Sequence, residues 1–190
     1  MLQMFEGLLK PSTLIAIGAA IVIAVYLYFL DKRTKSDEAA ALCKKYAVMT
    51  TELLAATPDD EVVRAVVANL MNKQDKRRPD AAAQLPLLSR GRAAVYSVWL
   101  LCHELETQDF TAVFHSPSRR FVDPAVDGLE RIGAPNTAIA LRAAVKALDE
   151  QESAPLLEAV TTVFREAMAS EKPLELCVQY IRDNPDEFVD

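Results

Sequence analysis

The sequence predicts an all-α protein, with one N-terminal transmembrane helix followed by a compact multi-helix domain. Three observations support this prediction. Residues 11–30 contain no charged side chain, and the chain has only 5 glycines among 190 residues. Apolar residues recur at spacings of three and four, the period of an amphipathic α-helix, and rarely alternate with polar ones as they would in a strand. We therefore divide the chain into a membrane anchor with its flanks (residues 1–35) and a helical soluble domain (residues 36–190).

The predicted anchor has the length and the apolar content of a membrane span. Twenty helical residues extend about 30 Å, the thickness of the hydrocarbon core of a bilayer. Ten of the seventeen residues in Leu14–Leu30 are Leu, Ile, Val or Phe, so the lipid bilayer is the first expected partner. The main alternative is a cleaved signal peptide. We favour a retained anchor because the apolar run is long and ends in charged residues where a cleavage site would lie.

Basic residues around the anchor predict its orientation, because they favour the cytoplasmic side of a membrane. Lys10 precedes the apolar run, whereas several basic residues follow it directly: Lys32, Arg33 and Lys35. We expect a single-pass protein of the cell membrane with its C-terminal domain in the cytoplasm. A stripe of small side chains allows a homodimer, since such stripes can pack two membrane helices closely. The stripe consists of Ala16, Ala20 and Ala24.

Cysteine usage agrees with a reducing compartment. The chain has three cysteines, an odd number with no C-x-x-C pair, which argues against a disulfide framework. We interpret them as small core residues: Cys43, Cys102 and Cys177. Charge is distributed unevenly, because residues 123–190 carry 6 Lys or Arg against 14 Asp or Glu. This acidic last third suggests a basic protein as a partner.

The first half of the soluble domain contains three predicted helices. Ser36-Asp37-Glu38 can cap a helix that reaches residue 53 or continues the membrane helix. Thr57-Pro58-Asp59-Asp60 predicts the start of a second helix. Ser89 opens a third, which is apolar on nearly all sides from Ala93 to Cys102, so its side chains should lie in the core. Residues 79–86 are expected to form a loop.

The second half continues with shorter helices separated by turn signals. Residues 109–118 are expected to be irregular. Asp123-Pro124 should cap a short helix that ends at Gly133, a favoured residue after a helix C-terminus. Further helices are predicted from Pro135, from about Pro155 and from Pro173, the last ending at Asn184-Pro185. The apolar stripe expected to be buried on the helix from Pro155 comprises Leu156, Val160, Val163 and Phe164.

A basic run at residues 73–78 has three interpretations. It can be a solvated helix end, since cations are favourable at a helix C-terminus. It can contact anionic lipid at the membrane surface. Nucleic-acid binding is the weakest interpretation, because the cluster is short, has no interleaved aromatic residues and belongs to an acidic chain. We therefore expect no direct nucleic-acid partner.

No catalytic, cofactor or metal motif is present in the sequence. Nucleotide-binding glycine patterns, G-x-S-x-G and H-E-x-x-H are all absent. The only histidines are His103 and His115, which show no ligand spacing. Glu104 follows the apolar helix and precedes a loop, where it can accept hydrogen bonds that fix the shape of the loop. We therefore expect no enzyme, no cofactor and no metal.

The chain resembles a known bacterial domain at this helix and loop. The resemblance comes from V-Y-S-V-W-L-L-C-H-E-L at residues 95–105, from Phe110 and Phe114, and from L-E-R-I-G-A-P at residues 129–135. These residues are similar to those of the largely uncharacterised DNA-mimic-protein C-terminal-like family, over roughly residues 90–190. The resemblance implies a helical domain with no established enzymatic activity. It marks five residues as structural or interaction positions: Trp99, Glu104, Phe110, Phe114 and Gly133.

The chain departs from this family pattern at the loop after the apolar helix. Members typically have Asn-Gly-Gly there, whereas this chain has Thr107-Gln108-Asp109, and Ala112 stands in place of a Gln. The loop therefore lacks glycines, which adopt positive φ angles easily.

Three functions remain open from the sequence. The preferred one is a membrane-anchored, non-catalytic protein-interaction module, in its sharpest form one whose carboxylates imitate DNA phosphates. The second is an enzyme that uses Glu104 with His103 or His115. The third is a structural, envelope-associated scaffold.

Overall fold

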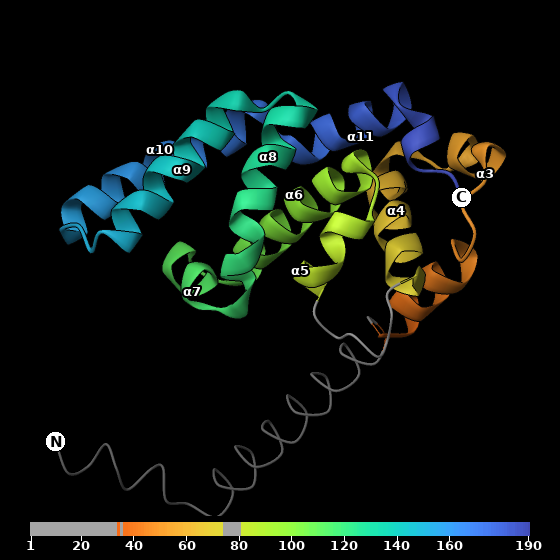
Figure 1. Cartoon of the computed structure of the whole chain (residues 1–190), viewed down its shortest axis with the longest axis horizontal. Coiled ribbons are helices and arrows are strands. Elements are labelled where there is room, and N and C mark those ends of the chain that lie inside the picture. The colour runs from red at the N-terminus through yellow and green to blue at the C-terminus, as the bar shows by residue number, and fades with distance from the viewer. Residues whose placement is uncertain (1–33, 35, 74–80) are drawn as a thin grey trace, which may run out of the picture. The chain divides into compact units, whose positions relative to one another are not determined.

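The computed structural model describes residues 34, 36–73 and 81–190, and the chain divides into two compact units between Lys44 and Lys45 (Figure 1). Residues 36–44 of the first unit are helical. The apolar run predicted as the anchor lies outside the described residues. Within the described ranges, no helix has both the length and the apolar character that crossing a bilayer requires.

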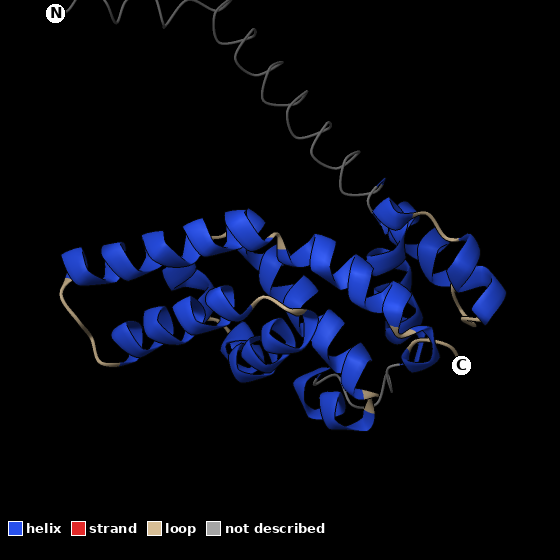
Figure 2. Ribbon diagram, turned by 90° about the horizontal axis from the view of Figure 1, so that it is seen from above, coloured by secondary structure: helices blue, strands red, loops and turns tan. Residues whose placement is uncertain are grey.

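The described part of the second unit consists of helices joined by turns and loops (Figure 2). This confirms the prediction of a compact all-α domain. Its α-helices are α3 (Thr51–Ala56), α4 (Asp59–Lys73), α5 (Ala81–Gln84), α6 (Arg90–Thr107), α7 (Phe110–His115), α8 (Val122–Ile132), α9 (Pro135–Asp149), α10 (Ala154–Glu171) and α11 (Pro173–Asp183). Its short 3₁₀ helices are η1 (Leu85–Leu87), η2 (Pro117–Phe121) and η3 (Pro185–Glu187).

Most helix boundaries lie at the capping residues that the sequence indicates. The Ser89 hydroxyl accepts a hydrogen bond from the backbone N–H of Arg92, which satisfies a free donor at the start of α6. Gly133 ends α8 with φ of 91°, a left-handed conformation that glycine adopts without steric cost. Pro135 and Pro173 occupy the first positions of α9 and α11, where a proline needs no N–H partner.

The prediction of a helix that reaches residue 53 is wrong. Helical structure ends at residue 45, and α3 begins only at Thr51. The Thr50 hydroxyl caps α3 by accepting from the Leu53 N–H, which gives the chain a new helix start. Tyr46 and Met49, between the two helices, are fully buried. Burial of these side chains therefore stabilises a turn where the apolar spacing suggests a continuous helix.

Two segments expected to be irregular contain short helices. In the first, Asp109 accepts a hydrogen bond from the Ala112 N–H and starts α7, which is followed by η2. Phe110 and Phe114, one turn apart, both point into the core and supply the burial that so short a helix needs. In the second, residues 81–87 form α5 and η1 rather than a plain loop. Helix α8 also begins one residue before the predicted Asp123 cap, directly after η2.

The core of the domain lies between α6 and α8, which form an extensive helix–helix contact (Figure 1). Val98 of α6 and Leu129 of α8 are fully buried in it. Gly128 permits this close approach, because a Cβ atom there would lie 2.8 Å from the carbonyl oxygen of Ala94. Helix α11 packs against α4, α6 and α8, and so connects the two ends of the domain.

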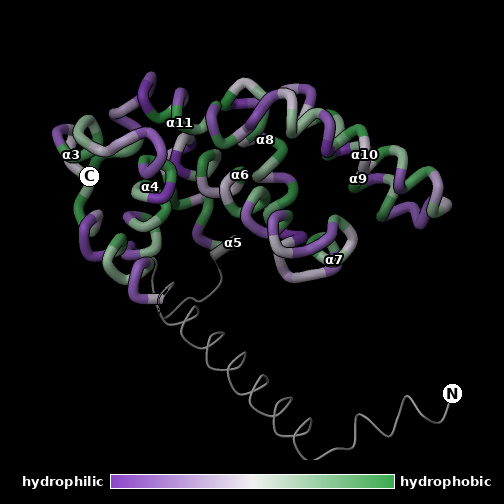
Figure 3. The backbone as a smooth tube through the Cα atoms, turned by 180° about the vertical axis from the view of Figure 1, so that it is seen from behind, coloured by the Kyte–Doolittle hydropathy of each residue, from purple (hydrophilic) through white to green (hydrophobic). Residues whose placement is uncertain are grey.

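Helices α9 and α10 form an antiparallel pair that extends beyond the core (Figures 1 and 2). Hydrophilic and hydrophobic residues alternate along both helices (Figure 3). Phe164 is buried as predicted, but Leu156 and Val163 are 44% and 56% exposed. The prediction that these two are core residues is wrong, because α10 packs mainly on α9 and leaves one apolar edge in solvent.

Long-range hydrogen bonds hold the C-terminal residues against α4 and α6. The Asp190 carboxylate accepts from the Arg92 guanidinium, from the Lys73 ammonium and from the Asn69 amide, and Asp190 is thereby joined to both helices. The Arg182 guanidinium donates to the carbonyl oxygens of Leu54 and Thr57, which ties α11 to the α3–α4 connection. These contacts make the sequence-distant ends of the domain one packed unit.

Candidate functional site

Glu104, the acid selected from the sequence, has structural partners. One of its carboxylate oxygens accepts a hydrogen bond of 2.5 Å from the Gln108 side-chain amide, and its backbone carbonyl accepts from the Gln108 N–H at 2.9 Å. The cavity that Glu104 lines with Val113 and Phe114 has a volume of about 10 Å³, at most enough for one water molecule. The Glu104 carboxylate thus contacts the side chain of Gln108, the residue that caps the end of α6.

The connection between α6 and α7 forms without glycine. Thr107 is the last residue of α6, Gln108 has φ of −134° and ψ of 156°, and Asp109 has φ of −73° and ψ of 161°. Both residues lie in the extended region that any residue adopts. The non-glycine sequence therefore gives a short, unstrained turn that fixes α7 beside the end of α6.

Both histidines make contacts with residues other than Glu104. The His103 ring stacks on Trp99 with ring centroids 5.2 Å apart, and its Nδ1 lies 3.9 Å from a carboxylate oxygen of Glu106. The Nδ1 of His115 lies 2.8 Å from the backbone carbonyl of Thr111, one turn earlier. Both side chains are exposed. Among the residues the structure describes, no three His, Cys, Asp or Glu side chains are grouped for metal binding.

The aromatic residues of the family pattern lie in two places. Trp99 is half-buried on α6, where it also stacks against Tyr96 at 6.2 Å. Phe110 contacts Phe114 with ring centroids 4.3 Å apart and meets Phe164 of α10 edge-on at 5.6 Å. Phe110 thus joins the segment selected from the sequence to a helix more than fifty residues later.

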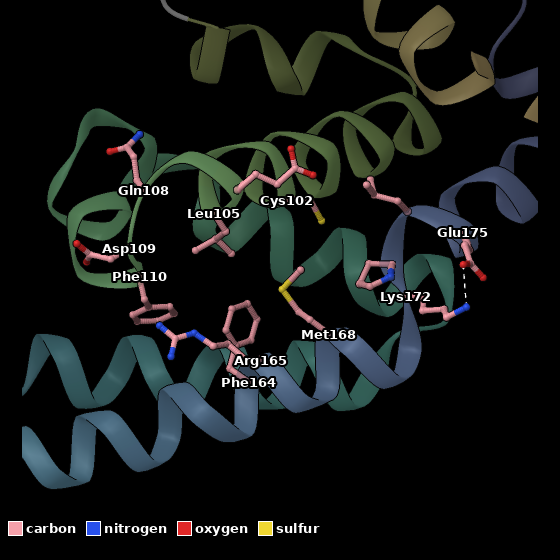
Figure 4. A pocket seen from close by; sticks show the side chains of 13 residues that line it. Cys102, Leu105, Gln108, Asp109, Phe110, Phe164, Arg165, Met168, Lys172 and Glu175 are labelled. Atoms are coloured by element: carbon pink, nitrogen blue, oxygen red, sulfur yellow. Dashed lines mark hydrogen bonds and ion pairs between the residues drawn. The ribbon is translucent and has the colours of Figure 1, made fainter. Parts of the chain in front are cut away.

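An apolar groove opens beside Phe110, between the end of α6, α7, α10 and the start of α11 (Figure 4). Its volume is about 460 Å³, within the range of pockets that bind small ligands or side chains. Apolar side chains form its floor: Cys102, Leu105, Phe110, Phe164, Met168 and Leu174. Sequence reasoning found only Phe110 as a candidate here, because the other residues come from helices whose packing it could not determine.

Charged side chains surround this floor on both sides. Glu106 and Asp109 line the groove from α6 and from the start of α7, and Arg165 lines it from α10. The Lys172 ammonium forms an ion pair of 2.9 Å with Glu175, so these two lining charges offset each other. The remaining lining charges are two carboxylates and one guanidinium, and the groove is therefore weakly acidic.

The thiol of Cys102 reports on the polarity of the groove floor. Burial raises the pKa of Cys102 to about 12, and the negative charge of Glu106 contributes to this rise. The thiol therefore remains protonated at neutral pH and acts as a small apolar side chain rather than as a nucleophile. Cys177 is also buried, and burial raises its pKa as well, whereas Cys43 is only half-buried.

Lys172 has an unusual backbone conformation for a lysine. It lies between α10 and α11 with φ of 50° and ψ of 67°, in the left-handed region where side chains carry a steric cost. The Lys172 N–H donates to the carbonyl of Met168, which closes the C-terminus of α10. Lys172 thus sets the angle at which α11 leaves the groove.

Comparison with known protein families identifies the domain that contains the groove. The sequence model of the DMP19-like protein family matches residues 86–184, more than half of the chain. The chain belongs to the DMP19-like protein family. This confirms the family resemblance found over roughly residues 90–190. No curated protein and no solved structure matches the chain significantly.

The DMP19-like region contains the whole groove. Every residue that lines it, from Cys102 to Glu175, lies within the matched range. Helices α3, α4 and α5 and the C-terminal residues 185–190 lie outside that range. The groove therefore lies entirely in the family-matched part of the chain.

Several acids of the last third of the DMP19-like chain bond within the domain. The Glu171 carboxylate accepts from the backbone N–H groups of Asn136 and Thr137 and so caps the N-terminus of α9. Glu187 accepts from the Gly91 N–H and from the Tyr180 hydroxyl. These carboxylates are engaged structurally, so the net acidity of the sequence overstates the charge that a partner would meet.

Proposed function

We propose that this DMP19-like protein is a membrane-anchored, non-catalytic interaction module, whose helical domain lies in the cytoplasm and binds a protein partner. The observation that carries this proposal is the apolar groove of about 460 Å³ in the family-matched part of the domain. A groove lined by apolar side chains, among which Leu105, Met168 and Leu174 are half-buried, is a suitable recognition site. The uncharged run at residues 11–30 with its basic flank supports the anchor and its orientation.

The contacts of Glu104 favour binding over catalysis. A general acid or base has to reach a substrate, but the Glu104 carboxylate bonds to Gln108 and lines a cavity of only about 10 Å³. The substitution Glu104→Gln should therefore leave partner binding intact and at most loosen the α6–α7 connection. Catalysis would gain support if this variant folded normally and bound its partner, yet failed to restore function to cells lacking the protein.

The groove is also a better interaction site than an acidic imitation of DNA. A DNA mimic needs carboxylates that are free to meet a basic surface. Three acids of the last third, Glu171, Glu187 and Asp190, instead accept hydrogen bonds from the domain itself, whereas others, such as Asp123, Asp127 and Glu152, are exposed. We prefer the groove as the interaction site because of its apolar lining, with the exposed acids contributing to solubility.

Cell fractionation tests the anchor and its orientation. The full chain should sediment with membranes and resist extraction by high salt, whereas a variant lacking residues 1–35 should not. A tag at the C-terminus should be protected from protease in intact cells and digested after lysis. Protease digestion of the tag in intact cells would reverse the orientation, and recovery of the full chain in the soluble fraction would exclude the anchor.

Site-specific photo-crosslinking tests the interaction site. A photoreactive residue at Met168, a half-buried residue of the groove, should give a discrete protein adduct in intact cells. The matched control carries the same residue at Ala143, an exposed position of α9 that does not line the groove. Equal adducts from both positions, or none from Met168, would contradict an interaction at the groove.

A further inference from the structure

We propose that the groove between α6, α7, α10 and α11 binds a peptide segment that carries a large apolar side chain and a nearby Lys or Arg. This inference rests on the proposed function and specifies the partner. The apolar side chain would occupy the floor formed by Leu105, Phe110, Phe164 and Met168. The cation would lie against the acidic wall formed by Glu106 and Asp109.

The size and composition of the floor indicate an apolar anchor. A volume of about 460 Å³ is larger than one buried side chain needs, so it can hold a large anchor residue together with part of its neighbour. The rings of Phe110 and Phe164 meet edge-on, and Met168, a flexible side chain able to adapt to different ligand shapes, lies on the same helix as Phe164. Apolar anchors that fill such a pocket usually supply most of the affinity of an interface.

The charges of the rim indicate a basic ligand. The Lys172–Glu175 ion pair is internally compensated, which leaves Glu106 and Asp109 opposite Arg165. The Glu106 side chain is 68% exposed, and one of its carboxylate oxygens lies 3.9 Å from the Nδ1 of the exposed His103. The Asp109 side chain accepts a hydrogen bond from the Ala112 N–H and is exposed, so a cation can still approach it. The charge of Glu106 also contributes to the raised pKa of Cys102, which indicates that its negative potential extends to the floor.

Arg165 provides a second polar contact on the opposite wall. Figure 4 shows its side chain extending from α10 toward Phe110 in this view. A guanidinium in this position can donate to a backbone carbonyl of a bound peptide, which would orient the segment across the groove. The same charges disfavour a fatty acid as the ligand. Its carboxylate would be repelled by Glu106 and Asp109, and only Arg165 would attract it.

Peptide display against the full-length protein in nanodiscs tests this inference. Random 12-residue peptides are selected at low salt, and the enriched sequences are synthesised for affinity measurements. Enriched peptides should share a large apolar residue with a nearby Lys or Arg, and binding should weaken as salt increases. Enrichment of acidic peptides, or of apolar peptides without a cation, would overturn the basic-partner assignment while leaving an interaction at the groove intact.

Charge-neutralising variants separate the acidic wall from general acidity. Glu106→Gln with Asp109→Asn should weaken peptide binding about tenfold, because two charge contacts are lost. Asn can replace Asp as a helix cap, so α7 should keep its start. The matched control, Glu152→Gln with Glu158→Gln, removes the same charge from exposed positions outside the groove and should change binding less than about twofold. Equal effects of the two pairs would refute a specific acidic wall.

A substitution of the floor tests the apolar anchor. Met168→Ala should weaken binding at least about tenfold, whereas the volume-conserving Met168→Leu should retain it. Circular dichroism spectra of both variants verify folding. If Met168→Ala binds the peptides as tightly as Met168→Leu and the parent protein do, the groove is not the binding site. The proposed function then fails together with this inference. Displacement of the peptides by laurate, with laurate binding more tightly than any selected peptide, would instead assign the groove to a lipid.

Discussion

The substitution Gly128→Ala tests whether the close crossing of α6 and α8 holds the domain together. Gly128 lies within α8 and is buried against α6. An added Cβ atom would lie 2.8 Å from the carbonyl oxygen of Ala94, 3.2 Å from the Cα of Ala94 and 3.0 Å from a methyl carbon of Val98. Two of these three neighbours are backbone atoms, so they can move only if the helices separate.

The expected effect follows from two opposing contributions. In an exposed helix, Gly→Ala increases stability by about 1 kcal/mol through helix propensity. Overpacking of a tight core typically costs about 1–3 kcal/mol. Because α6 and α8 also contact other helices, separation at Gly128 would disturb packing along the whole crossing. We therefore expect a net loss of about 1–2 kcal/mol in the free energy of unfolding.

Urea unfolding of the full-length protein in nanodiscs measures this loss. The only tryptophan, Trp99, lies on α6 and reports on the crossing by fluorescence. Gly133→Ala serves as a second glycine substitution, because nothing lies within 4 Å of its added Cβ and its cost arises from positive φ alone. Gly133→Asn should recover part of that cost, whereas Gly128→Asn should not. An increase in stability for Gly128→Ala would refute the inference of a rigid helix crossing.

Further predictions concern a helix cap, a strained residue and the thiols. Burial raises the pKa of Glu171, but hydrogen bonds from Thr137 and Asn136 outweigh this effect and lower it overall, so the carboxylate should contribute about 1 kcal/mol near neutral pH. That contribution to the free energy of unfolding should be complete above pH 4.5, the ordinary pKa of Glu, and should disappear as pH falls through the lowered pKa of Glu171. Urea titrations that compare Glu171→Gln with the parent protein at pH 7 and at pH 3 measure it. Lys172→Gly should raise the free energy of unfolding by about 0.5–1 kcal/mol, because relief of the left-handed side chain exceeds the extra entropy of the unfolded chain. Iodoacetamide at pH 8 should modify Cys43 well before Cys102, whose raised pKa lowers the thiolate fraction about a thousandfold, as mass spectrometry of the labelled peptides would show.

The sequence predicts those parts of the fold that depend on local chemistry. Ser89, Gly133, Pro135 and Pro173 lie at helix boundaries because a hydroxyl cap, a positive φ angle or a missing N–H is a property of the residue itself. The burial of Phe164 also agrees with its helical spacing. Such features require no knowledge of what a helix packs against.

Tertiary packing accounts for the parts that the sequence could not predict. Helix α7 has only six residues, too few for periodicity, and its burial depends on Phe164 of a distant helix. Val163 has the same helical spacing as buried residues but faces solvent, because its partner helix covers only one side of α10. The groove remained hidden for the same reason, since its walls come from α6, α7, α10 and α11.

Lys172 combines a strained backbone conformation with a position in the lining of the groove. Gln151 also has positive φ, at 53°, in the turn between α9 and α10, so this conformation alone does not mark a binding site. Lys172 differs because it lines the groove and its ammonium compensates Glu175. A glycine would close α10 at lower cost, but it would leave Glu175 as a third uncompensated carboxylate and remove the preference of a cation for the wall of Glu106 and Asp109. In the proposed complex, a lysine at this position would favour one orientation of a basic peptide at the expense of stability, and deviations from local preference of this kind are expected at functional sites.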